Sequence, residues 1–165
     1  MPFSHHFTKA VLVFSLILGY CVALGSMQQT PDEIKQVKNI FDAKRDASKD
    51  ILNALEIADK KSKHLLLHVG GNWCPWCRKF EHLLVENREI SKLISEKFIV
   101  VHVNYSSDNE NKEVLAKYPK VLGFPHFFVL DKSGKVLKSQ VSEELEDVNQ
   151  YNAEKVLAFL KKWAP

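Results

Sequence analysis

Residues 64–78 of this 165-residue chain read HLLLHVGGNWCPWCR, a stretch that carries a buried strand into a helix. The nearly continuous apolar run at residues 64–70 is typical of a strand covered on both faces. Two glycines end the run, and Pro75 suits the first position of a helix because it lacks the N–H that would be unpaired there. We therefore expect Cys74 and Cys77 at a strand-to-helix junction.

The sequence on both sides of this junction predicts alternating helices and strands. Helices are expected at residues 48–61, 75–85, 113–118 and 153–163, and strands at residues 64–70, 98–103, 126–130 and 135–138. The segment after Asn87 is expected to be another helix or a continuation of the helix before it. Polar and acidic residues 139–151 are expected to form a solvated loop. This order predicts an α/β fold in which helices flank a central mixed β-sheet.

A further helix start precedes this domain. Thr30 is a good N-cap, Pro31 suits the first turn, and Glu33 completes a capping box. Apolar residues follow at helical spacing, at Ile34, Val37, Ile40 and Phe41. We therefore expect an N-terminal helical extension at residues 26–47, ahead of a main domain at residues 48–165.

The composition excludes several classes of protein. With 45% hydrophobic residues the chain is too apolar for a disordered protein, and three cysteines are too few for a disulfide framework. The net charge is +3, and basic residues are scattered among acidic ones. Nucleic acid is therefore not an expected partner.

The amino terminus has the pattern of a secretory signal peptide. Residues 10–24 are apolar and uncharged, Lys9 precedes them, and small residues follow, so we expect residues 1–25 to be cleaved after Gly25. The run is shorter than the ~20 residues that span a bilayer, although an uncleaved anchor is one alternative. Lipidation of Cys21 is another, against which Tyr20 argues because a small residue is needed there. We expect an exported protein, periplasmic or secreted, with no stable membrane association after cleavage.

Cleavage would leave Cys74 and Cys77 as the only thiols. A helix start offers unpaired N–H groups and the positive end of the helix dipole, and both stabilise a thiolate at Cys74. Cys77 follows within the same turn and can close a disulfide with Cys74. Attack by Cys74 on a substrate, followed by resolution by Cys77, is the cycle that this spacing predicts.

Three other interpretations of the cysteine pair fit the sequence less well. A structural bridge across so short a loop would constrain the unfolded chain very little. A zinc site needs four ligands, and the chain has no second cysteine pair. Covalent haem attachment needs a histidine after the second cysteine, where this chain has Arg78.

From about residue 48 to residue 163, the chain resembles the thioredoxin family, and most closely its exported bacterial thiol-disulfide interchange proteins. The resemblance rests on the strand before the motif, on Trp73 with the two cysteines, on Gly123-Phe124-Pro125, and on the terminal hairpin and helix. It implies a thioredoxin fold and a cis peptide bond before Pro125, next to the redox pair. It also implies that the backbone of Phe124 is free to pair with a substrate strand.

The chain departs from the family pattern at three places. Where cytoplasmic thioredoxins have a buried acid and its lysine partner, this chain has His68 and His102, which predicts that His68 assists deprotonation of Cys77 or that both are core histidines. The dipeptide between the cysteines is Pro-Trp, which favours a less reducing potential than that of thioredoxin. His82 replaces the proline that kinks the helix after the motif in thioredoxin.

The predicted substrate platform is formed by Trp76, Phe124 and Pro125, whereas Trp73 is expected to be mostly buried. The predicted function is disulfide exchange with protein or peptide thiols, in a direction that the sequence leaves open. No diffusible cofactor is expected, because electrons can arrive through an upstream thiol-disulfide partner. Two alternatives remain: copper or zinc handling by Cys74, Cys77 and His126, and a redox-inert peptide-binding module.

Overall fold

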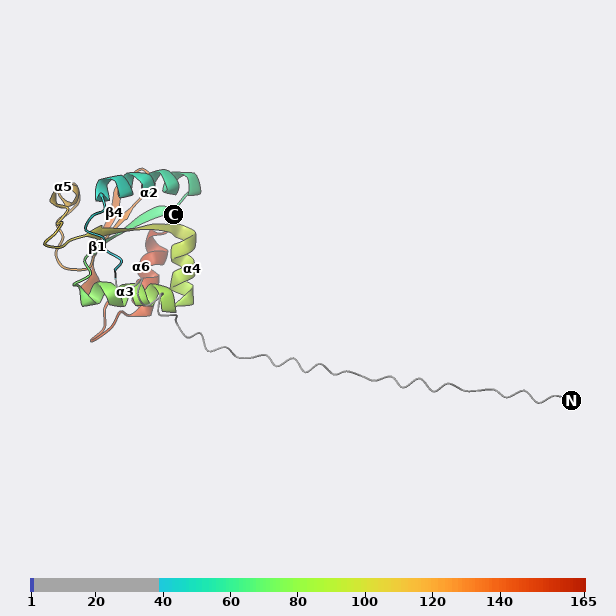
Figure 1. Ribbon diagram of the computed structural model, residues 1–165. Coiled ribbons are helices and arrows are strands. Elements are labelled where there is room, and N and C mark those ends of the chain that lie inside the picture. Colours follow the sequence, from blue (N-terminus) through green and yellow to red (C-terminus); the bar gives the residue numbers. More distant parts are fainter. Residues whose placement is uncertain (2–38) are drawn as a thin grey trace.

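The computed structural model describes Met1 and residues 39–165, and Figure 1 shows the latter as a sheet between layers of helices. The helices are α2 (Ala47–Lys61), α3 (Pro75–Glu86), α4 (Arg88–Lys97), α5 (Lys112–Leu115) and α6 (Ala153–Trp163), with a 3₁₀ helix η1 (Ser142–Leu145). The strands are β1 (His64–Gly70), β2 (Phe98–Asn104), β3 (His126–Leu130) and β4 (Val136–Val141). The expected signal peptide, Cys21 and the helix start at Thr30 lie outside the described residues.

The four strands form one mixed sheet in the order β2-β1-β3-β4. β1 pairs with β2 in parallel, whereas β3 pairs antiparallel with β1 and with β4. The register places His68 opposite His102 and Val69 opposite His126. The predicted central mixed sheet with flanking helices is therefore confirmed.

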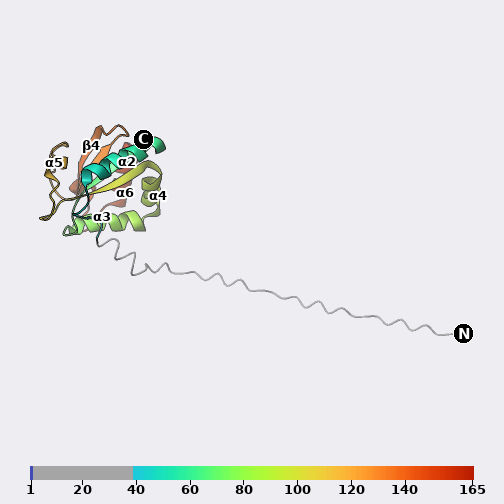
Figure 2. The same ribbon diagram turned by 45° about the horizontal axis from the view of Figure 1, so that its top comes forward.

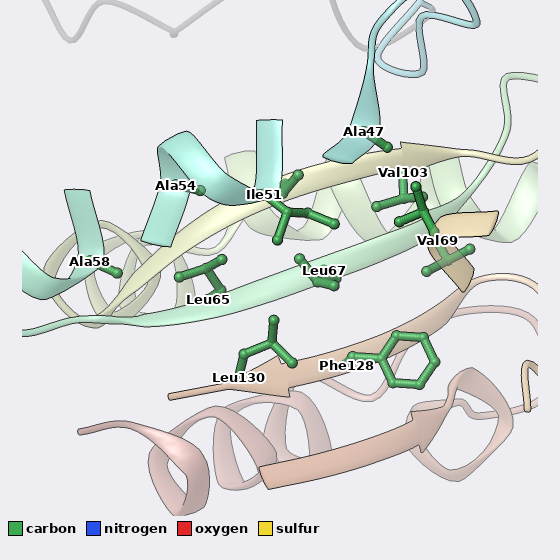
Figure 3. Close-up of a cluster of buried hydrophobic side chains, with 12 residues drawn as sticks. Ala47, Ile51, Ala54, Ala58, Leu65, Leu67, Val69, Val103, Phe128 and Leu130 are labelled. Carbon is green, nitrogen blue, oxygen red and sulfur yellow. The ribbon is translucent and has the colours of Figure 1, made fainter. Parts of the chain in front are cut away.

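Two different layers cover the sheet (Figure 2). α2 lies on one face, while α3, α4 and α6 lie on the other. Since side chains alternate along a strand, Leu65 and Leu67 of β1 point toward α2 and Leu66 points away. Figure 3 shows the α2 side, where small alanines such as Ala54 and Ala58 let the helix approach the sheet closely.

Side-chain caps fix the helix starts. The Asp46 carboxylate accepts a hydrogen bond from the backbone N–H of Lys49 (3.1 Å) at α2, and Asn152 accepts one from Lys155 (3.0 Å) at α6. Asn87 caps α4 and thereby separates it from α3, so the segment after Asn87 is a second helix and not a continuation of the first. No helix in the described part of the chain is long and apolar enough to cross a membrane.

Two expectations about local structure are wrong. Residues 39–46 form turns and no helix, so the apparent helical spacing of Ile40 and Phe41 does not reflect a helix. Residues 139–151 are also no simple solvated loop, because β4 continues to Val141 and η1 follows. Leu145 and Tyr151 are buried in the core there, and the acidic residues between them hide this pattern in the average composition.

Candidate functional site

The two cysteines lie at the junction of β1 and α3. Cys74 is the N-cap of α3, Pro75 begins the helix, and a disulfide joins Cys74 to Cys77 with their Cα atoms 5.3 Å apart. The backbone N–H of Cys77 donates to the Cys74 Sγ over 3.2 Å. The sulfur of Cys74 therefore lies where helix N–H groups and the helix dipole stabilise negative charge, as expected.

Burial and close packing surround this pair. Cys74 is 2% exposed and Cys77 is fully buried. Gly70, at the end of β1, passes directly beneath the disulfide, and a Cβ added at this glycine would overlap the Cys77 sulfur. The absence of a side chain at Gly70 is therefore what lets α3 approach β1 at the cysteines.

The loop before β3 completes the front of the site. The peptide bond between Phe124 and Pro125 is cis, which confirms the expectation from the sequence. The Phe124 side chain packs against the cluster that contains both cysteines. Its ring also lies 4.7 Å from that of Tyr105 and 5.5 Å from that of Trp73, centroid to centroid.

The two tryptophans differ from the expectation. Trp73, expected to be mostly buried, is 53% exposed, and its indole N–H donates to the Tyr105 carbonyl over 2.7 Å. Trp76 is half-buried, with its ring edge-on to Tyr151 at 5.4 Å and the Lys79 ammonium 4.2 Å above it. The reason is that the turn before α3 directs Trp73 outward along the Phe124 side, while the first turn of α3 lays Trp76 against Tyr151.

Behind the disulfide, three polar side chains meet in a cluster. The Glu81 Oε1 of α3 lies 2.7 Å from the His68 Nδ1 of β1 and 2.9 Å from the His102 Nε2 of β2. His68 is fully buried, and its Nε2 has no hydrogen-bond partner. The register that pairs His68 with His102 explains why both imidazoles reach one carboxylate.

The cluster is arranged to hold a negative charge in the interior. Burial by itself would raise the pKa of Glu81, but the hydrogen bonds from His102 and His68 outweigh it and hold that pKa far below the ordinary carboxyl value. Burial lowers the pKa of His68, against the opposing effect of Glu81. Glu81 is therefore a carboxylate at neutral pH, hydrogen-bonded to a neutral His68.

His68, Glu81 and His102 are also side chains of the kind that bind metal ions. The three ligand atoms lie within 4.8 Å of one another, but both imidazoles are at hydrogen-bond distance from one oxygen. A metal ion on the His68 Nδ1 would move the ring proton to Nε2, a buried atom without an acceptor. The geometry therefore fits a hydrogen-bonded cluster better than a metal centre.

The three ligands of the alternative metal site, Cys74, Cys77 and His126, do not come together in this structure. The cysteines are bonded to each other, and the His126 Nε2 lies 2.8 Å from the Ser139 hydroxyl. Like Phe128, His126 points to the α2 face of the sheet, whereas Cys77 lies on the α3 face. His126 is therefore a buried partner of β4.

The structure bears on the proton-transfer role predicted for His68 without testing it. No hydrogen bond between His68 and either cysteine is found, since its Nδ1 is bound to Glu81 and its Nε2 has no partner. The role stays a prediction.

Sequence reasoning missed two residues of the site. Glu81 lies four positions after Cys77 on a predicted helix, so its place on the same helix face was a usable signal. Phe41 gave no such signal, because its segment was expected to be helical. It is 2% exposed and packs against both cysteines.

Comparisons with known proteins agree with this site. A family model described as a thioredoxin-like domain matches residues 51–153. The chain is 30% identical over 93 residues to the disulfide bond reductase DsbH of Chlamydia pneumoniae, covering 51% of this chain and 55% of the relative. It is 28% identical over 97 residues to the thiol:disulfide interchange protein DsbD of Actinobacillus pleuropneumoniae, covering 58% and 16%. The chain thus spans about half or less of the length of these curated relatives.

A solved structure extends the likeness to 73% of this chain. A disulphide isomerase from Xylella fastidiosa Temecula1 aligns with a TM-score of 0.65 and 28% identity, over 73% of this chain and 93% of that chain. The sheet order, the cysteine pair at the start of α3 and the cis bond before Pro125 accompany this likeness. Since the family model also matches more than half of its residues, the chain belongs to the thioredoxin-like family and has a thioredoxin fold.

Proposed function

We propose that this protein is a thiol-disulfide oxidoreductase that exchanges disulfides with protein substrates through Cys74 and Cys77. The observation that carries the proposal is the disulfide at the N-terminus of α3, beside Phe124 and the cis Pro125. The chain has only three cysteines, so no second disulfide can form within it beside this pair. The relatives named as reductase, interchange protein and isomerase share this chemistry in their names.

In the reducing direction, the Cys74 thiolate attacks one sulfur of a substrate disulfide. A mixed disulfide forms, and the other substrate sulfur leaves as a thiolate that takes up a proton. Cys77 then loses its proton and attacks the Cys74 sulfur, which releases the second substrate thiolate. The substrate gains two electrons and the cysteine pair becomes the observed disulfide, which a dithiol partner must reduce. The same steps reversed oxidise a substrate dithiol.

The substrate is expected to lie along the loop before β3. The backbone of Phe124 precedes the strand ladder, which begins at His126, and the Phe124 side chain packs against the cluster that contains Cys74. Trp76 and Phe124 are both half-buried and offer aromatic surface for an extended polypeptide, whereas Pro125 is buried. Trp73 joins this surface, because more than half of it is exposed and it contacts Phe124.

Replacing single cysteines tests the proposal. Cys74→Ser should abolish both the reduction of insulin and the oxidation of a dithiol peptide, whereas Cys77→Ser should accumulate a mixed disulfide with the substrate, visible by mass spectrometry. Cys21→Ser makes the same chemical change outside the pair and should leave turnover intact. Retained turnover in Cys74→Ser would overturn the assignment. Equilibration of the wild-type pair with glutathione buffers gives the reduction potential and hence the preferred direction.

The protein is further proposed to act after export. The apolar run at residues 10–24 behind Lys9 supports this. Export predicts a mature chain that begins after Gly25, which the intact mass of the protein from a periplasmic extract would show. A full-length mass in the cytoplasmic fraction would contradict export without touching the proposed chemistry.

A further inference from the structure

Phe41 has an unusual position for a residue of an irregular segment. Residues 39–46, here called the strap, contain no helix or strand, yet Phe41 is 2% exposed. The Asn72 side chain grips its backbone twice, since the Phe41 N–H donates to the Asn72 Oδ1 (3.2 Å) and the Asn72 Nδ2 donates to the Phe41 carbonyl (2.6 Å). The Asn109 Nδ2 also donates to the Ala43 carbonyl (2.9 Å). The strap is thus fixed to the domain at two places.

The two hydrogen bonds between Asn72 and Phe41, here called the Asn72 clamp, hold the Phe41 ring on the inner side of the disulfide. The ring belongs to the same buried cluster as Cys74 and Cys77. It also lies edge-on to His68 at 5.0 Å and to His102 at 5.5 Å between ring centroids. One apolar ring therefore contacts both the redox pair and the cluster that holds the Glu81 carboxylate.

This arrangement matters for Cys77 once the disulfide is reduced. Cys77 then becomes a fully buried thiol, and an apolar environment disfavours the thiolate. Glu81 lies one helical turn away on the same face of α3, and its negative charge disfavours a second anion. In a dry interior such repulsion is much stronger than in water. Loss of the ring would open space beside polar groups, which water can enter.

The other titratable groups around Cys77 do not offset this effect. Cys74 is the N-cap of α3, and from the sheet His68 and His102 face the cluster while His126 points to the other face. Above pH 8, where thiols titrate, ordinary imidazoles are neutral, which leaves the carboxylate of Glu81 as the charge of the cluster.

We propose that Phe41 is a positioning residue for the redox pair, a buried ring that keeps the interior at Cys77 dry and so holds Cys77 as a neutral thiol while Cys74 attacks. The inference rests on the proposed function, because it explains why Cys74 attacks the substrate while Cys77 waits as the resolving thiol. It concerns a residue that is 2% exposed and acts through Cys77.

The test titrates Cys77 in the full chain carrying Cys21→Ser and Cys74→Ser, in which it is the only thiol. Thiolate absorbance at 240 nm is followed from pH 6 to pH 11 in the chain that keeps Phe41 and in the series Phe41→Leu, Phe41→Val and Phe41→Ala. The midpoint should fall stepwise as the side chain shrinks, by about one pH unit for alanine, which means about tenfold more thiolate at neutral pH. A midpoint that does not move along the series overturns the proposal, and Leu and Val suffice if the alanine variant does not fold.

Two controls separate this role from general stability. Phe159→Ala removes a buried ring of α6 in the core cluster on the same face of the sheet, and it should lower stability without moving the Cys77 midpoint. Glu81→Gln should lower the Cys77 midpoint more in the chain that keeps Phe41 than in the Phe41→Ala chain. In the alanine chain, water already screens Cys77 from the Glu81 charge. Equal shifts in both chains, or a shift from Phe159→Ala as large as that from Phe41→Ala, would refute the dry-interior account. The titration needs no turnover, so a chain without exchange activity would overturn the proposed function and leave this measurement readable.

Discussion

Opposite faces of β1 carry two different interiors, although their residues alternate along a single strand. Leu65, Leu67 and Val69 pack against α2 in a cluster of apolar side chains (Figure 3). On the other face His68 reaches Glu81, and Gly70 makes room for the disulfide. Both sets are fully buried, so burial alone does not mark the site. What distinguishes the α3 face is that polar and thiol groups replace the apolar packing there.

The largest effect is expected on the apolar face. Leu67→Ala should lower the free energy of unfolding by about 3 kcal/mol, because it leaves a cavity between α2 and the sheet. No titratable group is involved, so the loss should be the same at pH 5.5 and pH 7.5. Urea denaturation at both values measures it, with Leu52→Ala, at an exposed position of α2, as the control that should cost little. A loss that depends on pH would break the contrast between the faces.

The α3 face should respond to polarity rather than volume. Glu81→Leu keeps an apolar side chain of similar reach but removes the acceptor of His68 and His102, so we expect a loss of about 2 kcal/mol at pH 7. Glu81→Gln should cost about half as much, since its amide oxygen can still accept both hydrogen bonds. Denaturant unfolding of the two variants side by side measures the difference. If Glu81→Leu were as stable as the wild type, the cluster would contribute through apolar packing alone, as the α2 face does.

Sequence patterns predicted the strands and the main helices because each has a clear apolar period and a cap or a glycine at its end. His64–Gly70, His126–Leu130 and Ala153–Trp163 were expected with the bounds that the structure has. The cysteine pair and Pro125 followed from the motif and the family likeness. The α3 face was less predictable, because its contacts join distant elements.

Phe41 and Tyr151 show the physical reason for that gap. Phe41 is buried by the Asn72 clamp, a contact between residues 31 positions apart that no local pattern encodes. Tyr151 packs against Trp76 and Phe80 from a segment whose average composition is polar. Glu81 was within reach of helix periodicity, but its partners on β1 and β2 depended on the strand register.

Each face also contains one buried histidine, which gives a pH-dependent contrast. Burial lowers the pKa of His126, partly opposed by Glu143, so the unfolded chain takes up a proton first as the pH falls below about 6.5. Stability contributed by the neutral form is therefore present above that pH and is lost below it. His126→Gln, which can still bond Ser139, should flatten the decline between pH 7 and pH 5.5 by up to about 1 kcal/mol.

Unfolding by urea across that pH range gives the slope directly. His68 has its pKa lowered by the same cause on the other face, so the double variant with His68→Gln should flatten the decline further. An unchanged slope in His126→Gln would show that His126 takes up its proton in the folded chain as readily as in the unfolded one.

The smallest effect is expected at the rim where the α3 face opens to solvent. Trp73 is held by its hydrogen bond to Tyr105 and lines a hollow of about 460 Å³ together with Asn72 and Asp108. Because it is 53% exposed, Trp73→Ala should change the free energy of unfolding by less than about 0.5 kcal/mol. If it contacts the substrate, KM for a disulfide-containing protein should rise about threefold with kcat unchanged.

Val85→Ala is the matched control for that variant. Val85 is 56% exposed near the far end of α3, so it offers similar exposure without proximity to the cysteines. A rise in KM in Trp73→Ala alone places substrate contact at the rim. A fall in kcat with KM unchanged would instead mean that Trp73 affects the exchange step at the disulfide. The rim would then act on the thiols, as the buried residues of the α3 face do.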